Sequence, residues 1–166
     1  LSKVLLNKDD MLSLSSLDPA SDKSYLVNRP SVREFGDCCN EFWYTNTGLA
    51  KGIWREQIPH TQYLFYNVIQ SALIQMIDWY IGFRYQFSVN PGKYGKFYKK
   101  YLEPELYAEL LETYPTGDVN EAWKAVFSTI KLFQKVAQNV AKQLGVNYPL
   151  NEHEHIIEYL QHVKQL

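Results

Sequence analysis

Apolar residues recur at helical spacing through most of the chain after Ser31. Ser31 and Glu34 have the spacing of a capping box, in which each residue satisfies a backbone amide of the first helical turn. The apolar positions of the helix that follows are Phe35, Cys38, Phe42 and Leu49. A second helix is predicted from about Pro59 to Ile81, with Gly82 ending it. Its inward positions are Phe65, Val68, Ala72, Met76 and Tyr80.

Two shorter helices are predicted next. The first starts near Lys93 and ends before Pro104. The second runs from Pro104 to Tyr114, because proline is well tolerated at the first position of a helix and Pro115 follows at once.

The last two predicted helices are amphipathic. The longest opens at Asp118 and Glu121, which again have capping-box spacing, and stops at Gly145. Asn151 and Glu154 are predicted to cap the final helix. The inward positions of the two helices are Ala122, Val126, Ile130, Phe133, Ala137, Val140 and Leu144, then Ile156, Leu160 and Val163.

Five or six capped helices without a credible sheet predict an all-α helical bundle. Residues 3–10 differ, because a short apolar run is followed there by a turn, as at the exit of a strand, and no partner strand follows downstream. We therefore expect residues 1–12 to be the end of a preceding domain, residues 13–30 to form a linker or arm, and residues 31–166 to form the helical domain.

The amino-acid composition argues against several classes of protein. Of the 166 residues 46% are hydrophobic and 15% aromatic, which excludes a disordered chain. The net charge of −1 provides no overall attraction to nucleic acid, and no apolar run approaches the ~20 residues of a membrane span. With no signal-peptide pattern, we expect a cytoplasmic protein that binds neither nucleic acid nor membrane. The adjacent Cys38 and Cys39 are expected to be buried free thiols.

The first helix also has a polar stripe formed by Asp37, Glu41, Thr45, Gly48 and Gly52. Aromatic and charged residues flank or follow it, among them Trp43, Trp54 and Glu56. Carboxylates beside aromatic rings suit a polycationic, hydroxyl-rich ligand such as an aminoglycoside, and glycines in a helix often mark the close approach of another group. The alternative is a solvated face with glycines at the helix end.

Residues 92–101 combine two glycines with lysines and aromatic rings. Lys93, Lys96 and Lys100 are predicted to share one helical face. A helix start with lysines can hold a triphosphate through the helix dipole and point charges. The alternative is an ordinary solvated lysine face.

Other polar motifs give weaker hypotheses. Arg55 and His60 have a spacing found in helical ribonucleases of the HEPN class, although Pro59 interrupts the helix that would present them. His153, His155 and His162 lack Cys or carboxylate partners at ligand spacing, so we expect surface residues and not metal ligands.

Residues 37–44 (DCCNEFWY) and 50–56 (AKGIWRE) resemble the aminoglycoside 6-adenylyltransferase, or streptomycin adenylyltransferase, family. The likeness continues through residues 76–82 (MIDWYIG), 87–89 (FSV), 92–93 (GK), 99–102 (KKYL) and 123–125 (WKA), and also includes residues 4–9 and 22–23, so it covers essentially the whole chain.

The resemblance implies a transfer of AMP from ATP to a streptomycin hydroxyl with Mg²⁺, giving antibiotic resistance. Members join a helical C-terminal domain to an N-terminal nucleotidyltransferase domain, whose Gly-Ser and Asp-x-Asp motifs hold the metal ions. This sequence contains neither motif. The resemblance thus implies a C-terminal domain without catalytic residues, whose partner is the N-terminal domain. Alone, this domain is expected to be inactive and to bind neither ATP nor Mg²⁺.

By the same resemblance, Lys93 in its Gly-Lys pair, with Lys96, is expected to contact the nucleotide phosphates. Glu41, Trp43, Trp54 and Glu56 are expected to contact the drug. A rival hypothesis is a free-standing helical module that partners a separate nucleotidyltransferase chain.

Overall fold

The computed structural model describes residues 6, 8–9, 23–115 and 118–166. The predicted strand-like leader at residues 1–12 lies almost wholly outside these ranges, as do residues 13–22 of the predicted arm. The described part of the arm begins with the short 3-10 helix Lys23–Tyr25 and runs on to the first long helix.

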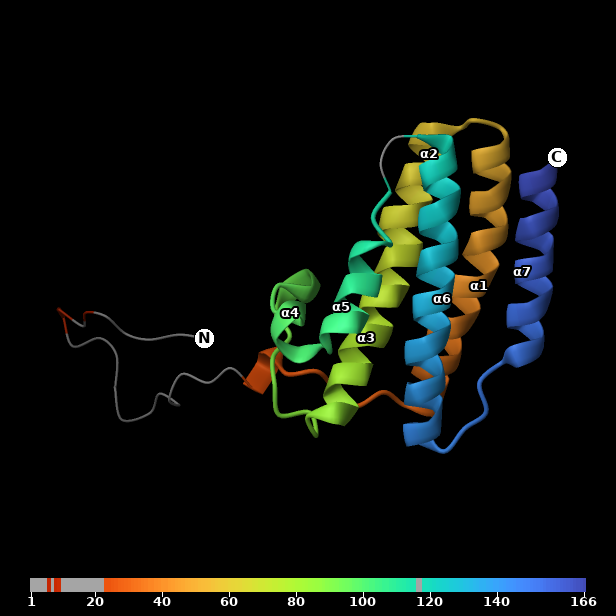
Figure 1. The fold of residues 1–166 in the computed structure, drawn as a ribbon. Coiled ribbons are helices and arrows are strands. Elements are labelled where there is room, and N and C mark those ends of the chain that lie inside the picture. Colours follow the sequence, from red (N-terminus) through yellow and green to blue (C-terminus); the bar gives the residue numbers. More distant parts are fainter. Residues whose placement is uncertain (1–5, 7, 10–22, 116–117) are drawn as a thin grey trace.

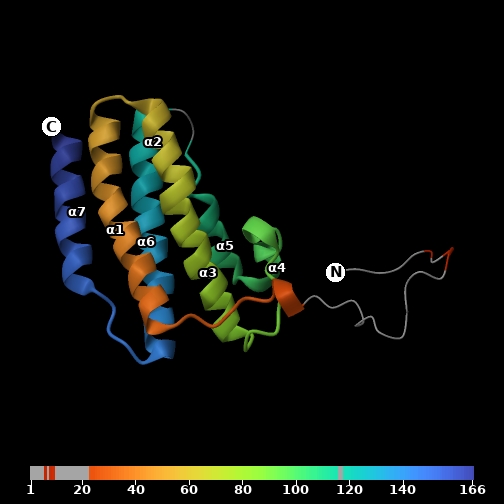
Figure 2. The same cartoon turned by 180° about the vertical axis from the view of Figure 1, so that it is seen from behind.

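The described residues form an all-α bundle and contain no strand, as predicted. Its helices are α1 (Val32–Trp54), α2 (Ile58–Leu64), α3 (Gln70–Arg84), α4 (Tyr98–Tyr101), α5 (Pro104–Leu111), α6 (Val119–Leu144) and α7 (Leu150–Gln165). A π-helical turn at Phe65–Ile69 joins α2 to α3, and a 3-10 turn at Lys93–Gly95 precedes α4. In both views α7 lies at one edge of the bundle beside α1, and α4 lies at the opposite edge (Figure 1 and Figure 2).

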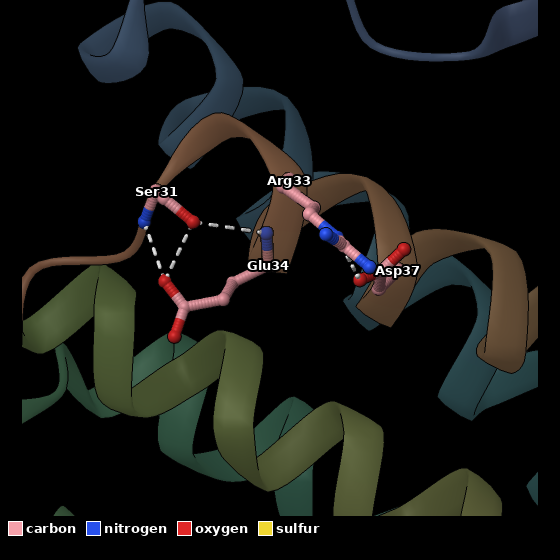
Figure 3. Close-up of polar contacts among 4 residues, drawn as sticks. All are labelled: Ser31, Arg33, Glu34 and Asp37. Atoms are coloured by element: carbon pink, nitrogen blue, oxygen red, sulfur yellow. Dashed lines mark hydrogen bonds and ion pairs between the residues drawn. The ribbon is translucent and has the colours of Figure 1, made fainter.

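The predicted capping box at the start of α1 is confirmed. The backbone amide of Ser31 donates to Glu34 Oε2 at 2.7 Å, and the amide of Glu34 donates to Ser31 Oγ at 3.2 Å (Figure 3). In the same first turn, Arg33 forms an exposed ion pair with Asp37, one turn further along, at 3.6 Å. Exposed pairs of this kind contribute little to stability, so the cap is the main local determinant of where α1 begins.

The predicted end of the second helix at Gly82 is wrong, because α3 continues to Arg84. Gly82 is buried, and a Cβ there would lie 2.4 Å from a ring carbon of Phe87. After Arg84 the chain turns back through Gln86 and Phe87, both with positive φ, and the Phe87 amide donates to the Gly82 carbonyl at 2.7 Å. Gly82 therefore makes room for a returning ring and does not end the helix.

Other predicted boundaries hold in part. Asp118 caps α6 by accepting from the amides of Asn120 and Glu121, and Gly145 ends it in the left-handed conformation, as predicted. The predicted cap of α7 at Asn151 and Glu154 is wrong, because the helix begins at Leu150 after Pro149. Proline holds φ near its helical value, so α7 starts there without a side-chain cap. The predicted helix to Tyr114 ends at Leu111.

The core is aromatic and centred on α1. Phe42 stacks on Phe133 of α6, with ring centroids 3.6 Å apart, and Trp43 meets Phe133 edge-on at 6.0 Å. α7 packs on α1, and α3 packs on α6. Cys38 and Cys39 are buried free thiols, as predicted, and burial raises the pKa of Cys39 to about 12. Such a thiol is not a reactive nucleophile.

Candidate functional site

A cavity of about 540 Å³ lies where the arm, α3 and the loop before α4 meet. Four charged residues line it: Arg29 of the arm, Glu34 of α1, Asp78 of α3 and Lys93 of the loop. Its aromatic wall consists of Tyr25, Trp79 and Tyr94. A cavity with both signs of charge and flat rings can hold a ligand that carries phosphate, cationic and ring groups.

Asp78 is fixed in this cavity by Tyr98. The buried Tyr98 hydroxyl lies 2.7 Å from Asp78 Oδ1, to which it donates, and 2.9 Å from the carbonyl oxygen of Ile74. Burial raises the pKa of the half-buried Asp78 to about 6, and the hydrogen bond from Tyr98 opposes that rise. No ion pair of the described residues involves Asp78, so the carboxylate has no cation partner among them.

The loop that carries Lys93 has an unusual backbone. Gly92 and Gly95 have φ of 78° and 75°, and Tyr94 between them has φ of 58°. A Cβ on Gly95 would lie 2.6 Å from the Tyr98 ring, so only glycine lets the loop close on that ring. Tyr98 therefore holds the loop and Asp78 together.

The predicted helical start at Lys93 is wrong, because three residues of 3-10 helix are followed by a separate α4. Lys93, Lys96 and Lys100 thus do not share one helical face, and so short a turn supplies no useful dipole. Lys93 still lines the cavity as an exposed point charge. Lys96 is exposed and lies outside the set of lining residues.

The glycines of the predicted polar stripe allow another helix to pack closely against α1. A Cβ on the buried Gly52 would lie 2.7 Å from Thr61 Oγ1, and Leu64 comes within 3.9 Å of the corresponding position on Gly48. The group that approaches α1 closely is therefore α2. Glu41 is exposed, and Asp37 is engaged with Arg33.

The four residues expected to contact a drug are not brought together. Trp43 is only 2% exposed, so it belongs to the core and has no face left for a ligand. At ~1.5 Å per residue, Trp54 at the end of α1 lies about 30 Å along the helix from the cavity residue Glu34, and Glu56 lies in the turn beyond that end. Glu41 is two helical turns, about 10 Å, from Glu34 on the same side of α1, so of the four it lies nearest the cavity.

The histidine predictions have mixed outcomes. Arg55 follows the last residue of α1, whereas His60 lies in α2, so the two are separated by a turn and not presented by one helix. His155 and His162 are exposed, as predicted. The prediction for His153 is wrong, because it is 6% exposed and packs edge-on against Trp43 at 4.9 Å. Burial lowers its pKa.

The sequence as a whole matches known proteins. The family model described as streptomycin adenylyltransferase matches residues 1–163 of the 166. The chain belongs to this family. It is 36% identical over 149 residues to an aminoglycoside 6-adenylyltransferase of Bacillus subtilis (strain 168), covering 90% of this chain and 52% of the relative. For the enzyme of the same name from Campylobacter jejuni the identity is 35% over 160 residues, covering 96% of this chain and 54% of the relative.

The fold also matches a family member of known structure. A crystal structure of an aminoglycoside 6-adenyltransferase from Bacillus subtilis superposes with a TM-score of 0.76 at 33% identity, covering 90% of this chain and 57% of that chain. The chain thus spans about half the length of the family members it matches. Within the described residues no helix is long and apolar enough to cross a membrane.

Proposed function

We propose that this chain is the C-terminal, acceptor-side half of an aminoglycoside nucleotidyltransferase that transfers AMP from ATP to a streptomycin hydroxyl and so gives resistance. The observation that carries the proposal is the family match over residues 1–163, in a sequence without the Gly-Ser and Asp-x-Asp motifs that the resemblance assigns to the catalytic domain. The catalytic carboxylates then belong to an N-terminal nucleotidyltransferase domain, the partner of this chain.

In this proposal the cavity holds part of the nucleotide. Lys93 of the loop and Arg29 of the arm both line the cavity, so each brings one cation to its wall. Ammonium and guanidinium groups form charge-assisted hydrogen bonds with phosphate oxygens. Lys96, outside the cavity, serves as an outer contact that attracts the triphosphate by charge alone.

In this proposal the carboxylates of Asp78 and Glu41 bind cationic groups of the drug. Asp78 has no cation partner among the described residues, and Glu41 lies exposed about 10 Å beyond the cavity along α1. A drug with several guanidinium or ammonium groups spans such a distance, so one cationic group reaches Asp78 while another reaches Glu41. Trp54 and Glu56 would touch only a ligand that extends to the far end of α1.

The Mg²⁺ that the resemblance implies needs oxygen ligands. Among the described residues no group of three or more His, Cys, Asp or Glu side chains is placed to hold a metal ion. We assign no metal chemistry to this chain, whose residues bind and orient the nucleotide and the drug. In the transfer, the drug oxygen bonds to the α-phosphorus and the bond to pyrophosphate breaks.

The test is Lys93→Ala in the full-length enzyme. Losing one charged contact with a partly exposed phosphate costs about 1.5–3 kcal/mol, so the KM for ATP should rise about ten- to a hundredfold, and more than the KM for streptomycin. Lys99→Ala is the matched control, because Lys99 is exposed and does not line the cavity. An ATP KM that is the same in both variants and the wild type would contradict the assignment of Lys93.

The division of the active site has its own test. Purified chain of residues 1–166, incubated with ATP, Mg²⁺ and streptomycin, should give no adenylylated drug by mass spectrometry. Product formed by this chain alone would refute the split site. A protein that instead occurs only as this length, and copurifies with a separate nucleotidyltransferase chain, would favour the free-standing module.

A further inference from the structure

Tyr94 combines strain with exposure at the wall of the cavity. It is one of four non-glycine residues with positive φ in the described chain, with Glu56, Gln86 and Phe87. Phe87 gains burial in return, because its ring packs against Gly82. Tyr94 does not, because its side chain is 78% exposed.

Neighbouring contacts impose this backbone on Tyr94. The Gly92 amide donates to Asn90 Oδ1 at 2.8 Å, and the Gly95 amide donates to the Gly92 carbonyl at 3.2 Å. Bulky residues rarely occupy this region without a compensating interaction, and such outliers concentrate where ligands bind. The backbone therefore fixes where the Tyr94 ring is attached, while most of the side chain remains exposed.

The ring is also next to the phosphate-binding lysine of the proposed function. Lys93 Nζ lies 4.9 Å from the centre of the Tyr94 ring, and both residues line the cavity. The Tyr94 side chain is 78% exposed, so most of its ring surface is accessible to a ligand in addition to Lys93. A nucleotide carries its base one ribose away from its phosphates, so a ligand held by Lys93 has its base within reach of Tyr94.

We propose that Tyr94 is a stacking platform for the base of the nucleotide whose phosphates Lys93 contacts. This inference rests on the proposed function and deepens it, by assigning a second nucleotide contact to the same loop. Stacking on an aromatic ring is tolerant of base identity, because every base has a π face. Tyr94 thus contributes affinity for a nucleotide and does not select adenine over guanine.

The experiment measures binding of ATP, GTP and inorganic tripolyphosphate to the full-length protein by calorimetry. Tyr94→Gly removes the ring and relieves the strained backbone, whereas Tyr94→Phe keeps the ring. The matched control is Tyr63→Ala on α2, which removes a ring that is 64% exposed and outside the cavity.

Tyr94→Gly should weaken ATP and GTP binding by a similar factor of about five or more, since each stacked base contributes ~1–3 kcal/mol. Tripolyphosphate binding should be unchanged, and the melting temperature should equal or exceed that of the wild type. Tyr94→Phe and Tyr63→Ala should bind all three ligands like the wild type.

The inference is overturned if Tyr94→Gly binds ATP normally. It is also overturned if the variant loses tripolyphosphate affinity by the same factor, because the loop and not the base contact would then be at fault. A wild type that binds tripolyphosphate as tightly as ATP refutes the stacking and leaves the role of Lys93 intact. A wild type that binds neither refutes the proposed nucleotide site and the inference together.

Discussion

Replacing Asp78 by asparagine should change the stability of the chain in a pH-dependent way. The difference in free energy of unfolding between the variant and the wild type should shift in favour of the variant from pH 5 to pH 8. Burial favours the protonated carboxyl group, so the folded state of the wild type holds its proton with a pKa of about 6, above the ordinary value of 3.8. The contribution of Asp78 to stability is therefore present at low pH and is lost as the pH rises from about 4 through 6. Asparagine does not ionise, and its amide oxygen can still accept from Tyr98.

The magnitude follows from the two pKa values. A difference of about two pKa units corresponds to a penalty of about 3 kcal/mol once Asp78 is fully ionised, at 1.36 kcal/mol per unit. Part of that penalty is already present at pH 5, where the unfolded carboxyl group is ionised. The free energy of unfolding of Asp78→Asn, minus that of the wild type, should thus increase by about 1.5 kcal/mol between pH 5 and pH 8.

Urea unfolding of this chain and the variant at both pH values measures that increase. The histidines titrate in the same range but are identical in the two proteins, so their contribution cancels in the difference. In thermal scans the same energy corresponds to about 3–6 °C of melting temperature. A difference that stays constant with pH, or that falls as the pH rises, would refute the conclusion that ionised Asp78 destabilises the fold.

Three further predictions concern other parts of the chain. Gly52→Ala places a methyl group 2.7 Å from Thr61 Oγ1 and should lower the free energy of unfolding by about 1–3 kcal/mol in urea titrations. Gly36→Ala is the control, because nothing lies within 4 Å of its Cβ position, and it should raise the free energy of unfolding by up to about 1 kcal/mol. Burial lowers the pKa of His153, so stability should fall as the pH drops below 6.5, and less so in His153→Gln; parallel pH profiles would contradict this. Glu41→Gln in the full-length enzyme should reduce kcat/KM for streptomycin about ten- to a hundredfold without changing the melting temperature, and wild-type kinetics would exclude the contact.

Local signals were sufficient for most of the bundle. The Ser31 cap, the Asp118 cap and the Gly145 stop each depend on a few neighbouring residues, and the structure contains all three. Gly82 misled the prediction because its role is tertiary, since the ring that needs the space comes from Phe87 in the returning chain. Glycine has the same appearance in a sequence whether it ends a helix or admits a side chain.

Burial was harder to predict than helix position. Periodicity identifies one inward face, which for α1 includes Phe42. The neighbouring Trp43 is buried as well, because α7 covers a second side of the helix and brings His153 against the indole ring. Nothing within α1 indicates that two sides are covered, so a core tryptophan was assigned to a ligand and a core histidine to the surface.

The cavity escaped prediction because its walls come from the arm, the start of α1, α3 and the loop before α4, and one side chain connects α3 to that loop. Tyr98 supplies the hydroxyl that fixes Asp78 on α3, and its ring occupies the space left by Gly95 in the loop of Lys93. The position of Lys93 relative to Asp78 thus depends on a residue that lies outside the cavity lining. Asp78, whose ionised form is disfavoured by burial, lines the same cavity as the strained, exposed Tyr94, and features that cost stability are concentrated where a fold holds a ligand.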